Sequence, residues 1–332
     1  MTETTLLKAD AVFEGGGVKG IGLVGAIAVA EERGIAWQNV AGTSAGAIVA
    51  TLIAAGYNAG EMKEILTDLD YDNFKDQSII DRIPRVGPLI SIIFEKGLYE
   101  GKFFQKWMGD LLKAKNITTF GDLLIPGEKA DKYRFKLRVI ASDITEGNML
   151  VLPQDIANYG VRPEDLNVAF AVRMSMSIPL FYEPVKLQNM KTGHTSYIVD
   201  GGVLSNFPVW LFDSVGSPPE WPTFGFKLVE PEEGTPRHIG GPISLLAALF
   251  STMMEAHDAR YIKDQDFVRT IAIPTLGVNT TEFDISRERS DALFQSGRQA
   301  ADEFFSTWDP QQYINKYRKG EAPGERGVQL RT

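Results

Sequence analysis

Short, almost wholly apolar blocks alternate along this chain with glycine-bearing turns and with longer apolar or amphipathic stretches. Short β-branched blocks predict strands, and longer stretches with helical spacing predict helices. The pattern predicts strands at residues 9–13, 35–41, 134–142, 149–152, 197–199, 223–229 and 268–273, and helices at 18–33, 45–55, 60–69, 101–115, 165–174, 242–263 and 287–305. Repeated strand–helix units predict an α/β fold, a three-layer sandwich with a mostly parallel central sheet covered by helices.

The pattern contains no internal repeat and two irregular segments. Residues 72–100 have an apolar centre, 86–94, which is interrupted by glycine and proline, and residues 213–222 are rich in proline, glycine and serine. The end of the chain is polar and glycine-bearing, which is typical of a poorly ordered terminus. We therefore expect one domain over residues 1–310, followed by a polar C-terminal tail at 311–332.

Composition narrows the class of protein. The chain has 332 residues, of which 44% are hydrophobic, and a formal net charge of −9, which speaks against nucleic-acid binding. It has no cysteine and three histidines, so thiolate metal sites are excluded and histidine-rich ones disfavoured, and we expect neither metal nor cofactor. Every apolar run is too short or too polar to span a bilayer, and no signal peptide is visible, so a cytoplasmic location is expected.

A serine at residue 44 stands in the sequence Gly42-Thr43-Ser44-Ala45-Gly46. This has the G-x-S-x-G form of a nucleophile elbow, in which a serine lies on a sharp turn between a strand and a helix. The small residues Gly42 and Gly46 let the strand and the helix cross closely. The alternative is a plain turn in which Ser44 caps the helix. A short apolar strand before Ser44 and a helix after it favour the nucleophile.

The first glycine-rich turn, at residues 15–20, admits two interpretations. Gly15, Gly17 and Gly20 match the G-x-G-x-x-G fingerprint of dinucleotide-binding folds, but the acidic residue that holds the ribose is missing after the next strand. The same row of backbone N–H groups suits an oxyanion hole. The residues assigned to that oxyanion hole are Gly15, Gly16, Gly17, Val18 and Lys19; the Lys19 side chain either adds a positive field or is simply solvated.

The nucleophile needs a base, and the histidines do not offer one. His194 and His238 lie in predicted loops and His257 in the middle of a predicted helix, where nothing around them supports catalysis. Asp200 instead ends an apolar strand and precedes two glycines, so its carboxylate lies where strand ends meet a cleft. An Asp-Gly turn is the plain alternative. Asp143 also ends a predicted strand, and there a turn role is preferred.

Together these motifs resemble the patatin-like phospholipases. The resemblance rests on the glycine turn at 14–20, the elbow at 42–46 and the Asp200 turn, with two further similar stretches at 141–145 and 171–184. It implies a Ser44–Asp200 dyad that works without histidine. The substrate is then a phospholipid or another fatty acyl ester, and the product forms through an acyl-enzyme. Glu14 and Lys19 depart from the family, which often has aspartate and arginine there.

Other functions remain open on this scaffold. An acyltransferase passes the acyl group to an alcohol instead of water. A nucleotide-binding regulatory module would use Gly15, Gly17 and Gly20, and a catalytically silent interaction protein is the third alternative. The missing ribose acid disfavours the module, and the presence of both Ser44 and Asp200 disfavours the silent protein.

Apolar side chains near these motifs suggest a substrate pocket and a lipid contact. Met174, Met176 and Phe181 suit an acyl pocket, and core packing explains them equally well. Residues 86–94 suit a lid or a buried loop. The helix at 101–115 carries aromatic and aliphatic residues at helical spacing with lysines beside them, which indicates either peripheral membrane contact or an ordinary core-facing stripe.

Overall fold

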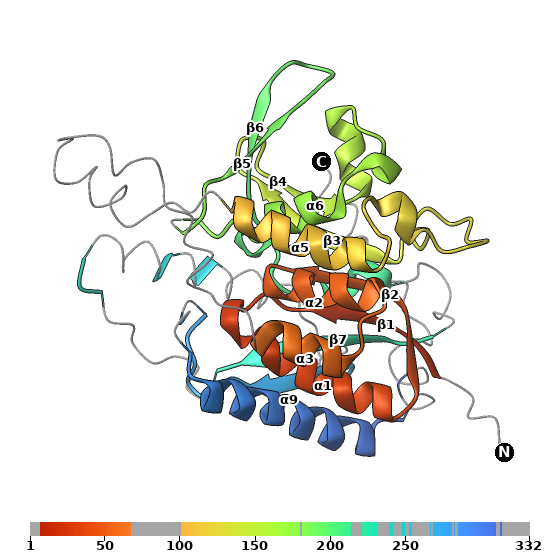
Figure 1. Ribbon diagram of the computed structural model, residues 1–332, viewed down its shortest axis with the longest axis vertical. Helices are drawn as coiled ribbons and strands as arrows, with labels where there is room; N and C mark the ends of the chain where they lie inside the picture. The colour runs from red at the N-terminus through yellow and green to blue at the C-terminus, as the bar shows by residue number, and fades with distance from the viewer. Residues whose placement is uncertain are drawn as a thin grey trace.

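The computed structural model is an α/β protein whose described residues form one eight-stranded sheet (Figure 1). It describes residues 7–67, 101–179, 181–213, 221–230, 239–241, 268–280 and 285–309, together with residues 248, 249, 252, 253, 266, 282 and 313. The strands are β1 Leu7–Phe13, β2 Ile35–Thr43, β3 Leu137–Asp143, β4 Asn148–Leu152, β5 Val185–Gln188, β6 Thr195–Asp200, β7 Thr223–Val229 and β8 Thr270–Pro274. The α-helices among the described residues are α1 Gly20–Glu32, α2 Ala45–Ala54, α3 Ala59–Thr67, α5 Lys102–Ala114, α6 Val168–Ser175 and α9 Arg287–Thr307.

The sheet has a parallel centre and an antiparallel edge. Its order is β5-β6-β3-β2-β1-β7-β8, with β4 paired to β3. The pairs from β3 through β8 along this order are parallel, whereas β3 pairs antiparallel with β4 and β6, and β5 with β6. The mixed α/β class and the mostly parallel sheet predicted from the sequence are therefore confirmed.

The register of β3 brings two distant segments together. Thr43 at the end of β2 pairs with Ile140 of β3, and the next β3 residue, Ala141, pairs with Asp200 at the end of β6. Ser44 follows Thr43, so neighbouring positions of β3 carry the two loops that hold Ser44 and Asp200. The sheet thus positions Ser44 and Asp200 at the same end of its strands, outside the carboxyl ends of β1 and β2, where α/β folds bind ligands.

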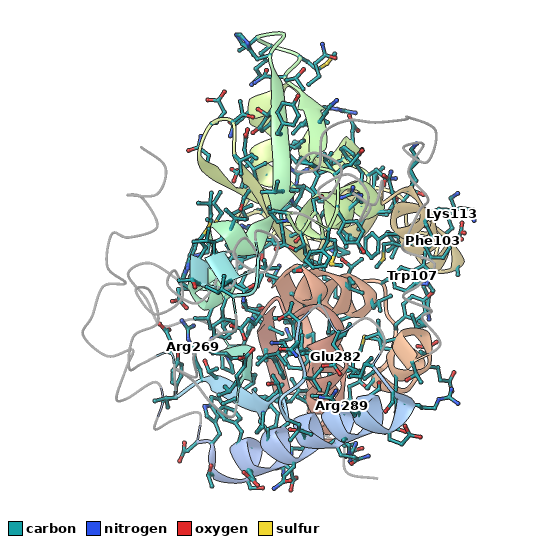
Figure 2. The ribbon with its side chains drawn as sticks, turned by 90° about the vertical axis from the view of Figure 1, so that its left-hand side faces the viewer. Phe103, Trp107, Lys113, Arg269, Glu282 and Arg289 are labelled. Carbon is teal, nitrogen blue, oxygen red and sulfur yellow. The ribbon has the colours of Figure 1, made fainter. Side chains whose placement is uncertain are left out.

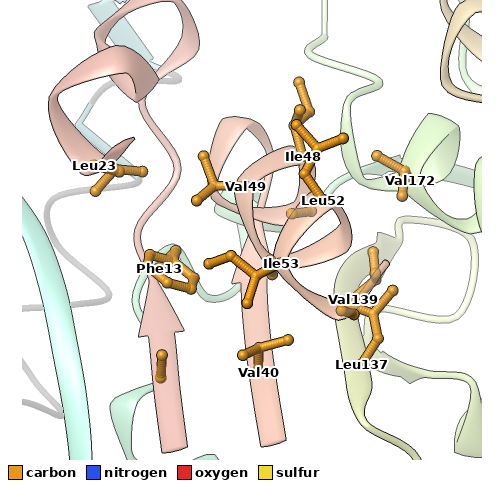
Figure 3. Packing of buried hydrophobic residues seen from close by; sticks show 14 of the residues in the cluster. Phe13, Leu23, Val40, Ile48, Val49, Leu52, Ile53, Leu137, Val139 and Val172 are labelled. Atoms are coloured by element: carbon orange, nitrogen blue, oxygen red, sulfur yellow. The ribbon is translucent and has the colours of Figure 1, made fainter. Parts of the chain in front are cut away.

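Alternate residues of the strands pack against two different layers. Ala11 and Phe13 of β1 belong to the large core formed with α1, α2, α6 and α9, whereas Val12 between them packs with Phe212 of the short helix η8, Val209–Phe212. Figure 3 shows α2 packed between strand residues such as Phe13, Val40 and Val139 on one side and Val172 of α6 on the other. Helix α2 is buried along its whole length, as its apolar sequence predicts.

The structure differs from the predicted elements in a few places. Strand β5 was not predicted, because an alternation of only four residues is too short to indicate a strand, and its place in the sheet comes from pairing with β6. The first predicted helix begins with a 3₁₀ turn, η1 Gly17–Lys19, before α1 starts at Gly20. Helix α6 starts later than predicted, at Val168, because the Asn167 side chain caps it by accepting the Phe170 N–H. The predicted helix at 242–263 falls largely outside the described residues, as do the 86–94 segment and, except for Tyr313, the 311–332 tail.

Candidate active site

Ser44 lies on a strained turn between β2 and α2. Its backbone has φ 54° and ψ −125°, a conformation that non-glycine residues adopt rarely. The turn needs glycines around it: a Cβ on Gly42 would lie 2.1 Å from the Gly46 carbonyl oxygen, and one on Gly46 would lie 2.3 Å from that of Phe13. The Ser44 side chain makes no capping hydrogen bond to α2. The strained backbone is that expected of a nucleophile elbow: Ser44 stands at the N-cap position of α2, but its side chain does not cap the helix.

A serine at the end of α6, Ser175, fixes the backbone of this turn through hydrogen bonds. Ser175 Oγ accepts the Ser44 backbone N–H at 2.9 Å and donates its own hydrogen to the Ile140 carbonyl oxygen at 2.5 Å. The Ser175 side chain is fully buried, so neither bond is shared with solvent. The sequence placed Ser175 in a stretch typical of the family without giving it a role. Its hydroxyl connects the strained turn to β3.

Asp200 lies at the end of β6 and is completely buried. Its Oδ1 accepts the Gly202 N–H at 2.8 Å, and its own backbone N–H donates to the Ser177 carbonyl oxygen at 2.9 Å. Burial raises the pKa of Asp200 from 3.8 to about 7, against the opposing effects of the Gly202 N–H and the Ser44 hydroxyl. A carboxyl with such a pKa is half ionised near neutral pH, which suits a general base.

The Ser44 hydroxyl lies near the Asp200 carboxyl. The hydroxyl lies close enough to lower the Asp200 pKa, and its oxygen is 3.8 Å from the sulfur of Met176. The buried Asp200 Oδ2 has no hydrogen-bond partner among the described residues. Catalytic hydrogen bonds are often long or poorly aligned before substrate binds. The unpaired carboxylate oxygen is therefore available to accept the Ser44 proton.

The glycine turn lies directly beside the nucleophile. A Cβ on Gly15 would lie 3.0 Å from Ser44 Cβ, and the turn continues through Gly17, whose φ of 56° and 1.9 Å Cβ approach to the Thr280 carbonyl oxygen require glycine. Of the amides predicted as oxyanion donors, that of Gly15 donates to the Asn206 carbonyl and that of Val18 to the Thr280 carbonyl, both within the protein. The Gly16 and Gly17 amides have no acceptor among the described residues. The fifth predicted amide, that of Lys19, donates to the Gly16 carbonyl oxygen at 3.2 Å, so Gly16 and Gly17 remain as candidate donors.

Charged side chains on either side of the glycine turn are paired. Glu14 Oε1 accepts from Lys227 Nζ at 2.7 Å and Oε2 from the Leu228 N–H at 2.5 Å, which fixes the end of β1 to β7. Lys19 Nζ, whose side chain is almost fully buried, lies 3.1 Å from Glu230 Oε1. The solvated state considered for Lys19 is therefore wrong. Its charge is balanced by Glu230 before any substrate arrives.

Comparison with known proteins places this arrangement in a family. The family model described as patatin-like phospholipase matches residues 11–213, which include the glycine turn, the elbow and Asp200. The chain belongs to the patatin-like phospholipase family. Across 300 residues it is 43% identical to the uncharacterized protein YqhO of Bacillus subtilis, covering 90% of this chain and 98% of that protein. It is 27% identical over 198 residues to a probable lipid hydrolase, 463L, of Invertebrate iridescent virus 6, covering 60% of this chain and 61% of that protein.

A solved structure confirms the fold. VipD from Legionella pneumophila superposes with a TM-score of 0.55 at 19% sequence identity, over 90% of this chain and 67% of that chain. At this identity the likeness concerns the fold alone. Membership of the patatin-like phospholipase family supports a lipid acyl hydrolase as the general class of activity for this chain.

The other residues singled out from the sequence fall into separate roles. Met174 is completely buried in the core, Met176 contacts Ser44, and Phe181 is partly buried just beyond α6. Asp143 takes the turn role expected of it, because its Oδ1 accepts the Thr145 and Glu146 N–H groups. His194 is exposed at the tip of the β5–β6 hairpin, away from Ser44 in the register of β6. Only Met176 of the three predicted pocket residues is seen in contact with the nucleophile.

Helix α5 carries the stripe that suggested membrane contact. Phe104, Met108 and Leu112 point into the core and are buried, whereas Phe103 and Trp107 are partly buried against it. Figure 2 shows Phe103, Trp107 and Lys113 along α5 at the edge of that view. The buried half of the stripe has the core-facing role. Among the described residues no helix has the length and hydropathy needed to cross a membrane.

Proposed function

We propose that this protein is a carboxylic ester hydrolase that cleaves fatty acyl esters with a Ser44–Asp200 dyad. The observation that carries the proposal is the pairing of a serine on a strained elbow with a fully buried carboxyl whose pKa is about 7. A serine hydroxyl is a poor nucleophile until a neighbouring group takes its proton. Asp200 has the pKa near neutral pH and the unpaired carboxylate oxygen that a general base requires.

The proposed reaction has two halves. Asp200 Oδ2 accepts the Ser44 proton while Oγ attacks the ester carbonyl, and the Gly16 and Gly17 N–H groups stabilise the oxyanion. The C–O bond to the alcohol then breaks, the leaving oxygen takes the proton from Asp200, and an acyl-Ser44 ester remains. Water, deprotonated by Asp200, attacks this ester, and the fatty acid leaves as Ser44 regains its proton. Each half returns Asp200 to its starting charge.

An apolar substrate agrees with the surroundings of the nucleophile. The contact between the Met176 sulfur and Ser44 Oγ places a flexible apolar side chain where the acyl group must enter. A phospholipid or another fatty acyl ester is therefore the proposed substrate, with peripheral contact to a lipid surface. Transfer of the acyl group to an alcohol, instead of to water, uses the same acyl-enzyme.

The nucleotide-binding alternative has little support in the geometry. Gly17 is packed against Thr280, and a Cβ on Gly20 would lie 3.3 Å from that of Ala45. In a dinucleotide-binding turn the second glycine lets the backbone approach the pyrophosphate, whereas here the Thr280 carbonyl occupies that side of Gly17; the close packing at Gly20 fits either kind of turn. Titration with adenine and nicotinamide nucleotides tests this alternative directly, and we expect no saturable binding.

Active-site labelling tests the proposal. A fluorophosphonate probe should modify the wild-type protein at Ser44, as peptide mass spectrometry of the adduct reports, and should leave Ser44→Ala unlabelled. Hydrolysis of p-nitrophenyl esters should be lost in the same variant, and kcat/KM should rise with pH through an apparent pKa of about 7 as Asp200 loses its proton. A labelled residue other than Ser44, or full ester hydrolysis by Ser44→Ala, would contradict the dyad.

A further inference from the structure

Asn206 follows Asp200 on the same loop and holds the glycine turn, although no step of the proposed reaction uses it. Its backbone carbonyl accepts the Gly15 N–H at 3.3 Å, and its side-chain Nδ2 donates to the Gly15 carbonyl oxygen at 3.3 Å. The side chain is buried, with 5% of the residue exposed. One residue of the base-carrying loop thus binds both polar groups of Gly15.

The two hydrogen bonds between Asn206 and Gly15 also set the direction of the Gly16 N–H. A peptide unit is planar, so the Gly15 carbonyl and the Gly16 N–H point in opposite directions from one rigid plane. Fixing the carbonyl therefore fixes the Gly16 N–H, which is one of the two turn amides without an acceptor among the described residues. We propose that Asn206 is a positioning residue that aims the Gly16 N–H at the oxyanion. The inference rests on the proposed hydrolase function.

The side-chain amide of Asn206 can bind the Gly15 carbonyl oxygen in only one orientation, with Nδ2 facing it. If its nitrogen and oxygen were exchanged, Oδ1 would face the Gly15 carbonyl oxygen and two acceptors would repel each other. In the orientation observed, Oδ1 is buried without a partner among the described residues, which costs stability. An apolar side chain would fill the same space without that cost. The hydrogen bond to Gly15 therefore explains the amide better than packing does.

The loop that carries Asn206 is itself fixed to the elbow. Thr43 Oγ1 donates to the Ser205 carbonyl oxygen at 3.1 Å, and the Ser205 N–H donates to the Gly201 carbonyl oxygen at 2.8 Å. A Cβ on Gly15 would lie 2.4 Å from Asn206 Oδ1 and 3.0 Å from Ser44 Cβ, so Asn206 and the elbow both pack closely against Gly15. Base, nucleophile and oxyanion donor are then held in one arrangement by residues 200–206.

The test compares Asn206→Ala with Asn39→Ala. Asn39 is a matched control, because it is equally buried, its Nδ2 donates to the Tyr133 and Phe135 carbonyls, and its Oδ1 also lacks a partner among the described residues. Both variants should melt below the wild type. Asn206→Ala should lower kcat for p-nitrophenyl butyrate about 10- to 100-fold with KM within about twofold, whereas Asn39→Ala should keep the wild-type kcat.

A second measurement separates positioning from loss of structure. An alkyl trifluoromethyl ketone forms a tetrahedral oxyanion on the serine, so its affinity should fall in Asn206→Ala by about the same factor as kcat and stay unchanged in Asn39→Ala. Asn206→Asp, which is nearly isosteric but places a charged acceptor against the Gly15 carbonyl, should behave like Asn206→Ala.

Several outcomes overturn the inference. An active wild type whose Asn206 variants match Asn39→Ala in kcat and ketone affinity overturns it alone. Failure of both Asn206 variants to fold assigns the residue to stability and also counts against it. A wild type that neither hydrolyses the ester nor binds the ketone overturns the proposed function, and this inference with it.

Discussion

An aspartate and an asparagine are buried near each other in two places of the structure, and one of these places lies beside Ser44, the proposed nucleophile. Asp200 and Asn206 lie beside the elbow. Asp10 lies on β1 and Asn39 on β2, near the side of the sheet at which the neighbouring strands β7 and β3 begin. Burial raises the pKa of Asp10 to about 7 as well. A raised pKa therefore does not by itself distinguish a catalytic carboxyl from a structural one.

The difference lies in how each carboxyl is bonded. Asp10 Oδ1 accepts two hydrogen bonds from distant elements, the Asn39 N–H at 2.9 Å and the Trp221 Nε1–H at 2.8 Å. Asp200 Oδ1 accepts only the nearby Gly202 N–H, and its Oδ2 remains unpaired among the described residues, next to a hydroxyl. Asp10 is hydrogen-bonded to two distant elements, whereas Asp200 has the Ser44 hydroxyl beside it, as the proposed general base requires.

The largest expected effect is on catalysis. Asp200→Asn should lower kcat for p-nitrophenyl esters by about 10²–10⁴-fold, because an amide cannot accept the Ser44 proton. Asp10→Asn keeps an acceptor oxygen for Asn39 and Trp221 and should stay within about threefold of the wild type. Steady-state kinetics at pH 8 measures both. Equal losses in the two variants would erase the distinction drawn between the two carboxyls.

Asp10 and Asp200 should have the same effect on how the free energy of unfolding depends on pH. Each keeps its proton up to about pH 7 in the folded chain but loses it near pH 4 when unfolded, so the folded state binds more protons in this window and stability falls as the pH rises. Asp10→Asn and Asp200→Asn should therefore be more stable than the wild type at pH 8, by about 1–3 kcal/mol, and this gain should disappear toward pH 4. Urea unfolding at several pH values checks the trend; a gain that grows as the pH falls would contradict it.

A smaller effect is expected from the hydroxyl behind the elbow. Ser175→Ala removes the acceptor of the Ser44 N–H and should lower kcat about tenfold, because the strained turn loses the bond that fixes it. Thr270→Val is the control, since Thr270 Oγ1 also donates to a buried carbonyl, that of Asp266, but on the edge strand β8. Unfolding should show comparable losses of stability in the two, about 1 kcal/mol, while kcat falls only in Ser175→Ala. A similar fall in kcat for Thr270→Val would remove the special role of Ser175.

The smallest effect concerns acyl-chain selectivity. Met176→Ala removes the side chain that contacts Ser44 Oγ, and it should shift the preference among p-nitrophenyl esters by about two carbons toward longer chains, with changes of two- to fivefold in kcat/KM. Met174→Leu changes a methionine that lies wholly in the core and should leave the preference unchanged. The ratio of kcat/KM for the octanoate and butyrate esters measures the shift. An identical profile in both variants would place Met176 outside the acyl pocket.

Local features of the sequence were enough to predict the elbow, the glycine turn and the Asp200 turn. Each depends on residues that are neighbours in the chain: Ser44 lies between small residues that permit its strained backbone, and Asp200 ends an apolar strand before two glycines. The long buried helices and most strands were predicted for the same reason, since periodicity is a property of consecutive residues.

Tertiary contacts decided what the sequence left open. Whether the Val18 amide is free depends on Thr280, and which way the Gly16 amide points depends on Asn206, both far away in the chain. Strand β5 owes its place to β6, and Ser175 received its task from a turn that precedes it by more than a hundred residues. The pKa of Asp200 likewise follows from complete burial, which no short stretch of sequence encodes. The sequence thus determined which groups are candidates for the proposed chemistry, and packing between distant segments decided which of them are left without a hydrogen-bond partner among the described residues.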